Sequence, residues 1–321
     1  MSQSDLSISW QRRVLLKYEQ ILFRIIALPM ALMPAPIAYG LAVLRGDYLF
    51  SLDAPTRKAR LESLKRAFGD ELTPSTINRI LRDTFRLRSC ERVDVMRLIG
   101  DAKRIEGLVS INGLENIQRS LKAGKGVILC SAHFGSYESS ISLLSRRGLP
   151  ITFITGEDWK TAPDHATSPL RRIGRVFLLY TPMVSHHLRR KSIITSDKFS
   201  AVKAAGVLQS GELVFTQLDK IVKRNESSRA ISVEFLNSER MFLPGAITLA
   251  KSSGAPILIT LIRRASDWRH QILDISRPIS LEGETDVCLR RCVTAIESAV
   301  RERPALWRHW DRGLAIWVPN Q

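Results

Sequence analysis

The sequence is poor in cysteine and has no cysteine pair spaced for a metal or redox centre. Its four cysteines, Cys90, Cys130, Cys288 and Cys292, contain no C-x-x-C pair. Cys288 and Cys292 are four residues apart, one helical turn, a spacing that favours packing on one helix face over metal binding. So few cysteines in a chain of 321 residues predict a reducing compartment and no disulfide framework.

Several functional motifs are also missing. The chain has no zinc-finger pattern, basic zipper or RNA-recognition signature, so nucleic acid is not an expected partner. The glycines of Gly124-Lys125-Gly126 lack the G-x4-G-K-[ST] spacing and precede a strand, which excludes a phosphate loop. His186 and His187 have no suitably spaced Cys, Asp or Glu beside them, so we predict no metal site.

Acidic residues are scarce relative to basic ones. The chain has 31 Asp and Glu against 48 Lys and Arg, a formal net charge of +17. A basic surface of this kind suits anionic partners such as phosphate headgroups, an acidic carrier protein or nucleic acid. Charge alone does not choose among them.

Charge is absent from residues 25–44, an apolar run of twenty residues. A helix of that length spans roughly 30 Å, the thickness of the bilayer core. Pro29, Pro34 and Pro36 would break or kink it. We therefore predict that residues 1–50 form a membrane-anchoring arm, either a kinked span or two interfacial helical pieces, with its basic flank cytoplasmic. The alternative is a helical hairpin packed in the core.

Residues 51–321 are predicted to form one further domain. Amphipathic helical patterns occupy most of residues 51–106, and short apolar strands then alternate with helical segments to residue 301. The expected strands lie at 109–112, 127–130, 150–154, 212–216, 232–236, 255–262 and 271–275. This alternation predicts an α/β fold, a largely parallel sheet with helices on both faces, preceded by the hydrophobic N-terminal arm.

The candidate site lies where one of these strands ends. Residues 127–130 are wholly apolar, as in a buried parallel strand, and His133 follows in a glycine-containing turn. Ser136 is placed to cap the next helix, with Glu138 in its first turn. Ligands of open α/β sheets bind at the carboxyl ends of strands, so His133 lies where chemistry is expected.

His133 and Glu138 could form a dyad. On one continuous helix five residues rotate about 500°, and the side chains would point apart. With His133 in the turn and Glu138 on the helix, the carboxylate can fix the imidazole tautomer and leave the other ring nitrogen to take a proton. The nucleophile would then be a substrate hydroxyl. The alternative is a serine hydrolase that uses Ser131 or Ser136 with His133, although G-x-S-x-G is absent.

The block His133-Phe-Gly-Ser-Tyr-Glu138 resembles the His-x4-Asp/Glu block of the glycerolipid acyltransferases. It is most similar to the lipid A biosynthesis (lauroyl/myristoyl) acyltransferase branch, where the block usually reads His-Phe-Gly-Asn-Trp-Glu. The stretch from Pro304 to Arg312 resembles the family's C-terminal Pro-x-x-Trp-x-Trp-x-His-x-Arg end. Together with weaker intervening matches, the resemblance extends over residues 55–312.

The resemblance implies transfer of a fatty acyl chain from an acyl carrier protein or CoA thioester to a hydroxyl or amine of a lipid or glycolipid, most closely lipid A. It also implies a glycerolipid-acyltransferase-like fold, no cofactor beyond the acyl donor, and the cytoplasmic face of a bacterial inner membrane. His133 would be the general base and Glu138 the residue that orients it. The remaining alternative is a basic membrane-binding protein of the same fold without activity.

Six further residues are expected to contact substrate. Backbone N–H groups near Gly135 and at the start of the following helix are the candidate oxyanion donors. Asp219 lies at another strand end, where the family has Asp-Gln or Asp-His-Asp but this chain has Asp219-Lys220. Gly245 would allow close approach of a substrate, or simply begin a helix after Pro244. The full set is Gly135, Ser136, Arg189, Arg190, Asp219 and Gly245.

Overall fold

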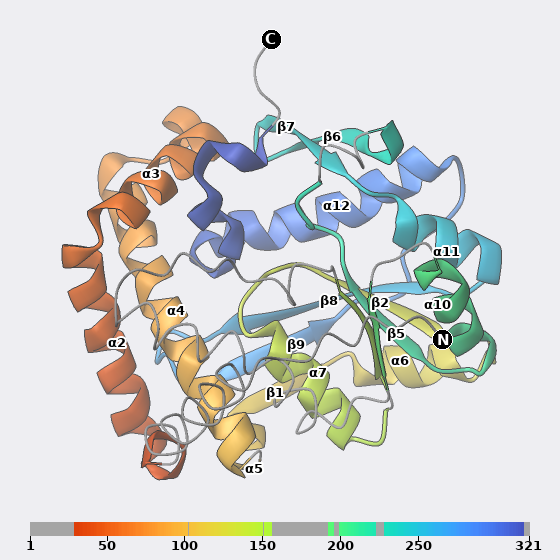
Figure 1. The fold of residues 1–321 in the computed structure, drawn as a ribbon, viewed down its shortest axis with the longest axis horizontal. Coiled ribbons are helices and arrows are strands. Elements are labelled where there is room, and N and C mark those ends of the chain that lie inside the picture. The colour runs from red at the N-terminus through yellow and green to blue at the C-terminus, as the bar shows by residue number, and fades with distance from the viewer. Residues whose placement is uncertain are drawn as a thin grey trace, which may run out of the picture.

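The computed structural model describes residues 29–101, 103–149, 151–155, 192–195, 199–222 and 228–317. At its centre is a seven-stranded sheet in the order β1-β9-β8-β2-β5-β3-β4 (Figure 1). Neighbouring strands are parallel except for the antiparallel pair β8–β9, so the predicted largely parallel α/β sheet is confirmed. The strands are β1 (Val109–Asn112), β2 (Val127–Ser131), β3 (Ile151–Thr155), β4 (Ser192–Thr195), β5 (Leu213–Gln217), β8 (Ile257–Arg264) and β9 (Gln271–Ile275).

Helices cover both faces of the sheet, as expected, with α10, α11 and α12 on one side and α6 and α7 on the other (Figure 1). The N-terminal helices α2, α3 and α4 stand together at one end of the sheet. The α-helices are α2 (Ala35–Leu52), α3 (Ala54–Phe68), α4 (Pro74–Asp101), α5 (Lys103–Glu106), α6 (Leu114–Leu121), α7 (Tyr137–Arg146), α10 (Ser200–Gln209), α11 (Gly245–Ser253) and α12 (Thr285–Glu302). Short 3-10 helices are η1 (Gly69–Glu71), η4 (Pro304–Leu306) and η5 (Arg308–Ile316).

The core is divided by the sheet into two halves, and β2 contributes to both. Side chains of a strand alternate between its faces. Val127 and Leu129 pack in the cluster beneath α7, whereas Ile128 and Cys130 pack in the cluster that includes α12. All five residues of β2 are buried, which explains why its sequence is a continuous apolar run and not an alternating one.

Two strands were not predicted. β4 lies within residues 156–200, where the sequence showed no regular pattern. β7 (Ser238–Phe242) carries Glu239 and Arg240 and pairs antiparallel with β6 (Ile231–Phe235) as a separate two-stranded sheet. Charged residues hide this strand, because Glu239 lies on its exposed face and the buried Arg240 donates to the distant backbone carbonyl of Asp219.

The sheet register places two chain segments side by side at the carboxyl ends of β2 and β5. In the parallel pair of β2 and β5, Ser131 is opposite Gln217. Both strands therefore end at the same edge, and the turn that contains His133 lies beside the segment that contains Asp219.

The described part of the predicted N-terminal arm is packed against the domain. The helix at residues 29–32 ends at Met33, and Pro34 precedes α2, so the apolar run is broken where proline predicted. The inner face of α2 packs on α4 through Ala38, Tyr39 and Ala42. Within the described residues, no helix is long and apolar enough to cross a bilayer. The predicted boundary at residue 50 falls inside α2, and residues 1–28 lie outside the described part.

The close packing of α2 on α4 predicts opposite effects of two glycine substitutions. A Cβ at Gly46 would lie 2.5 Å from the Cα of Arg86, whereas a Cβ at Gly40 would meet nothing within 4 Å. Gly46→Ala should therefore lower the free energy of unfolding by about 1–3 kcal/mol. Gly40→Ala, on the exposed face of the same helix, should raise it by about 0.5–1 kcal/mol. Chemical denaturation of both variants measures this, and equal effects would contradict the observed packing.

Candidate active site

The His133 side chain is bound to Asp219, which comes from the neighbouring strand end. The Nδ1 atom of His133 lies 2.8 Å from Oδ1 of Asp219. The backbone N–H of His133 also donates to this carboxylate, with the nitrogen 3.0 Å from Oδ1 and 2.9 Å from Oδ2. Asp219 therefore holds both the ring and the backbone of the turn.

Asp219 is completely buried and ionised. Burial by itself would raise the pKa of Asp219, but its interactions with His133, His309 and Arg240 outweigh this effect, and its pKa lies well below the usual value. An ionised carboxylate only accepts hydrogen bonds, so Nδ1 of His133 must carry the proton. This fixes Nε2 as the nitrogen with the lone pair. The His133 side chain is 25% exposed, so the ring is accessible from solvent.

Glu138 does not make the hydrogen bond that the sequence suggested. Its two carboxylate oxygens accept from Nη1 and Nη2 of Arg308, each at 2.9 Å. Burial raises the pKa of Glu138, but Arg308 outweighs this effect and the pKa is lowered. The expected bond between Glu138 and the His133 ring is therefore corrected: Asp219 is the partner of the ring, because it lies directly beneath it at the adjacent strand end.

Arg308 joins Glu138 to a larger buried ionic network. Its Nε lies 3.1 Å from Glu91 on α4. Arg88, also on α4, lies 3.3 Å from Glu91 and donates at 2.8 Å to the backbone carbonyl of Arg308. Buried charges of this kind are costly unless they are paired, and here each carboxylate has a guanidinium partner. The network fixes the C-terminal segment to α4 and α7.

The same C-terminal segment pairs through its backbone with the turn that contains His133. Gly135 N–H donates to the Leu306 carbonyl at 2.8 Å, and Arg308 N–H donates to the His133 carbonyl at 2.8 Å. Phe134 and Trp307 form an isolated antiparallel bridge between these two bonds. Because the Gly135 N–H is already used, it is not available as the oxyanion donor that the sequence predicted.

Trp307 makes a contact with Asp219 that the sequence did not predict. Trp307 is buried in the hydrophobic core. Its indole Nε1, however, donates to Oδ2 of Asp219 at 2.9 Å. The family-like C-terminal block was the only sequence signal near Trp307, Arg308 and His309, and it does not say what these side chains contact.

Ser136 is at the N-cap position of α7, but its side chain makes no capping bond. Its hydroxyl donates instead to the buried Asp94 of α4, and Nη2 of Arg264 lies 3.0 Å from it. Asp94 also accepts from the hydroxyl of Tyr39 at 2.6 Å. The Ser136 hydroxyl is therefore enclosed by the protein and bonded to Asp94, and its contact with substrate stays a prediction.

The remaining predicted residues are not brought to the site by the described contacts. Arg189 and Arg190 lie outside the described residues. Gly245 begins α11 directly after Pro244, and a Cβ there would meet nothing within 4 Å. No neighbouring atom of the protein therefore requires glycine at position 245. This agrees with the alternative that Gly245 simply begins a helix after Pro244.

The cluster of His133, Asp219 and His309 has the residue types of a metal site. Their possible ligand atoms all lie within 4.8 Å of one another. Both Asp219 oxygens, however, already accept hydrogen bonds from His133 N–H groups or from Trp307. A divalent cation would have to displace these donors, so the arrangement suits a proton better than a metal.

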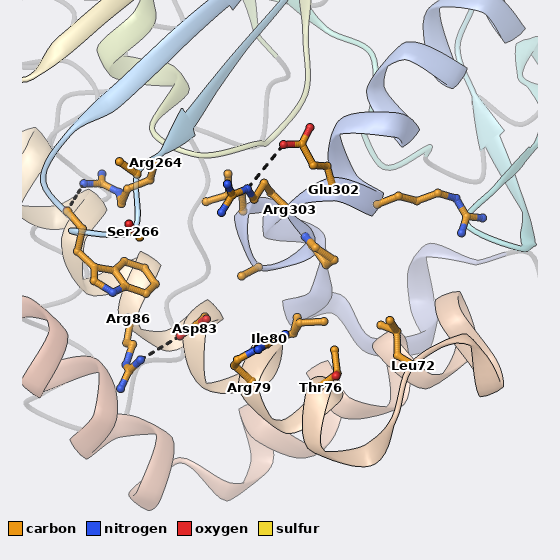
Figure 2. A pocket seen from close by; sticks show the side chains of 16 residues that line it. Leu72, Thr76, Arg79, Ile80, Asp83, Arg86, Arg264, Ser266, Glu302 and Arg303 are labelled. Atoms are coloured by element: carbon orange, nitrogen blue, oxygen red, sulfur yellow. Dashed lines mark hydrogen bonds and ion pairs between the residues drawn. The ribbon is translucent and has the colours of Figure 1, made fainter.

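A separate cavity of about 440 Å³ lies between α4, the β8–β9 turn and residues 301–306 (Figure 2). Arg264 and Leu306 line it and also contact the catalytic turn. Neither His133 nor Asp219 lines it. Figure 2 shows the ion pairs that compensate two of its arginines, one with Asp83 and one with Glu302.

The comparison with known families decides which kind of protein this is. Residues 7–174, more than half of the chain, match the family described as bacterial lipid A biosynthesis acyltransferase. The chain belongs to this family. The lipid A biosynthesis acyltransferases are transferases of lipid metabolism, with an acyl donor and a lipid acceptor as substrates. No individually curated protein matches the chain.

The family match contains only one half of the candidate active site. His133 and Glu138 lie inside residues 7–174, whereas Asp219 and Arg308 lie beyond them. The hydrogen bonds between these halves come from the tertiary structure alone. For this lipid A biosynthesis acyltransferase, the family match therefore shows the general activity, and the contacts suggest which residues perform it.

The tight catalytic turn predicts that Gly135 cannot be replaced. Its φ is +55°, and a Cβ there would lie 2.1 Å from the carbonyl oxygen of Ile262. Gly135→Ala should abolish acyl transfer because the turn must move. Gly148→Ala is the matched control, with a φ of +81° but nothing within 4 Å of the Cβ. It should cost about 1–2 kcal/mol of stability and keep activity. Comparable activity of the two variants would show that the close contact is unimportant.

Proposed function

We propose that the protein transfers an acyl chain from a thioester of acyl carrier protein or CoA to a hydroxyl or amine of a lipid A-type glycolipid, with His133 as general base. The observation that carries the proposal is the 2.8 Å contact between His133 Nδ1 and the buried, ionised Asp219. This contact leaves Nε2 able to accept a proton and provides a negative charge beside the imidazolium that forms.

The proposed reaction needs no covalent acyl-enzyme. Nε2 of His133 takes the proton of the acceptor hydroxyl or amine while that oxygen or nitrogen bonds to the thioester carbonyl carbon. The tetrahedral intermediate collapses with cleavage of the C–S bond, and His133 returns the proton to the thiolate. No resident metal or cofactor is required. Backbone N–H groups at the first turn of α7 are the remaining oxyanion-donor candidates, since the Gly135 N–H is used.

In this proposal Glu138 does not contact the reacting atoms and acts through Arg308. It holds Arg308, and the backbone N–H of Arg308 donates to the His133 carbonyl at 2.8 Å. The turn is then held at both of its ends. Asp219 binds His133 at one end, and the ion pair of Arg308 with Glu138 fixes the other end. Glu138 is therefore a positioning residue in the proposal, and Asp219 is the carboxylate that supports the imidazolium.

The two rival functions are less well supported. A serine hydrolase would need a hydroxyl bonded to His133, but Ser136 bonds to Asp94 and the Ser131 hydroxyl lies 3.4 Å from the Ala132 carbonyl. A non-catalytic membrane-binding protein would have no use for an ionised Asp219 beside an imidazole that is accessible from solvent. Measurement of thiol release with and without acceptor separates transfer from hydrolysis and from inactivity.

The proposed location is the cytoplasmic face of a bacterial inner membrane. The outer face of α2 supports it with an exposed apolar stripe at helical spacing. The stripe is made of Ile37, Leu41, Leu44, Tyr48 and Leu52. The chain's charge of +17 would add attraction to anionic lipids and to an acidic carrier protein. Arg189 and Arg190 stay candidates for contact with acceptor phosphates.

The assignment of roles predicts a graded series of variants. His133→Ala and Asp219→Asn should each lower kcat by about 10²–10⁴, because the base or its charge partner is lost. Glu138→Gln should cost less, on the order of tenfold, since one hydrogen bond to Arg308 is retained. Steady-state acyl transfer measures the series, with circular dichroism as the test of folding. If Glu138→Gln lost as much activity as His133→Ala while Asp219→Asn stayed nearly fully active, the dyad of His133 and Glu138 would be supported instead.

The α2 stripe predicts where membrane affinity is lost. Leu44 is 65% exposed on the stripe, and Val202 is 71% exposed on α10. Leu44→Gln should weaken partition to vesicles of phosphatidylethanolamine and phosphatidylglycerol by about tenfold, because one leucine no longer enters the apolar layer. Val202→Gln, the control of similar exposure, should leave partition unchanged. If flotation shows no difference between the two, α2 does not contact the bilayer.

A further inference from the structure

Asp219 has a second imidazole beside it that the proposed reaction does not use. His309, in η5, is only 7% exposed, and its Nε2 lies 3.4 Å from Oδ2 of Asp219. Its ring centroid is 4.5 Å from that of His133, with an angle of 56° between the rings. The carboxylate therefore lies between two histidines, with the His133 ring on Oδ1 and His309 facing Oδ2.

The Nε2 atom of His309 is buried without a hydrogen-bond partner among the described residues. Such an atom costs about 1–3 kcal/mol of stability, and native proteins rarely keep one without a use. Hydrogen bonds of an active site are often long in the unliganded enzyme and tighten during the reaction. The 3.4 Å separation from a carboxylate oxygen fits a donor of this kind.

His309 is uncharged at neutral pH. Burial lowers the pKa of His309 well below 6.5, against the raising effect of Asp219. The charged and titratable groups that face it are Asp219, His133, Arg240 and Arg312. The His133 ring is faced by Asp219, His309 and Tyr137, whose ring centroid is 5.6 Å away. Among the described groups that face both histidines, Asp219 is the carboxylate that they share.

We propose that His309 is a positioning residue of the acyl transfer, whose Nε2 approaches Oδ2 of Asp219 at 3.4 Å as a donor and so limits how strongly this carboxylate attracts the proton of His133. The inference rests on the proposed function, since it concerns the same base. Asp219 has to stabilise the imidazolium in the transition state, yet if it bound the resting ring too strongly, His133 would be protonated before the acceptor arrived. The donors Trp307 and His309 stabilise the Asp219 carboxylate and so reduce its attraction for the proton of His133.

The decisive variant is His309→Phe, which keeps a ring of similar size and removes the N–H. With one donor lost, Asp219 should favour protonated His133 more, and the acidic limb of the kcat/KM profile should move up by about one pH unit. At the pH where wild type is half-maximal, the variant would be about fivefold slower. At high pH the two enzymes should have equal rates. A merely structural defect would lower the rate at every pH.

Stability provides an independent check on the same variant. His309→Phe removes both the long 3.4 Å contact with Asp219 and a poorly satisfied buried polar atom, and because these effects oppose each other, its thermal unfolding should stay close to that of wild type. His309→Gln keeps an N–H donor and should restore part of the wild-type profile. A pH-independent loss in His309→Phe together with lower stability would overturn the proposal, because His309 would then only fill space.

A measurement without turnover separates this inference from the proposed function. The full chain labelled with ¹⁵N-histidine can be titrated by NMR in detergent, with the His133→Ala spectrum used to assign the His133 signals. The His133 midpoint should be higher in His309→Phe than in wild type. A raised midpoint in a protein that shows no acyl transfer would support the role of His309 and refute the acyltransferase mechanism. An unchanged midpoint would refute the role of His309 whatever the activity.

Discussion

The buried carboxylate of Asp219 is the constraint on which the active site depends. A fully buried charge is tolerated only where donors satisfy it, and here they come from segments far apart in the chain. His133 donates from its backbone and its ring, Trp307 donates from its indole, and Arg240 donates to the Asp219 carbonyl at 2.5 Å. The need to satisfy one anion therefore brings the turn that contains His133 and the C-terminal segment together, and the bond of Arg240 to the backbone carbonyl adds the β6–β7 hairpin.

The C-terminal segment behaves as a structural part of the catalytic turn. Its backbone pairs with residues 133–135, and the Arg308 guanidinium binds Glu138 and Glu91. A second buried group, centred on Asp94, links Ser136 to Tyr39 on α2. Through these two polar groups the turn is joined to the helices at the N-terminal end of the chain, which include the α2 stripe proposed to meet the membrane.

The local sequence pattern was sufficient to predict much of the fold and half of the candidate site. The apolar run at 127–130, the turn after it and the helix beginning near Glu138 are set by short-range effects, namely burial on both faces, glycine in the turn and helix periodicity. The α/β class followed from the alternation of such segments, and the break at Pro34 followed from proline chemistry. Strands β4 and β7 were missed because their residues follow no simple apolar pattern.

What the sequence by itself determined is that His133 ends a buried strand and that Glu138 starts the following helix. Only the tertiary structure decided which carboxylate reaches the imidazole. Glu138 is five residues away in sequence, but Arg308 neutralises it from the far end of the chain. Asp219 is 86 residues away, yet the parallel pairing of β2 and β5 places it beneath the ring. Strand order and the pairing of buried charges depend on contacts between distant segments, and spacing along the chain does not encode them.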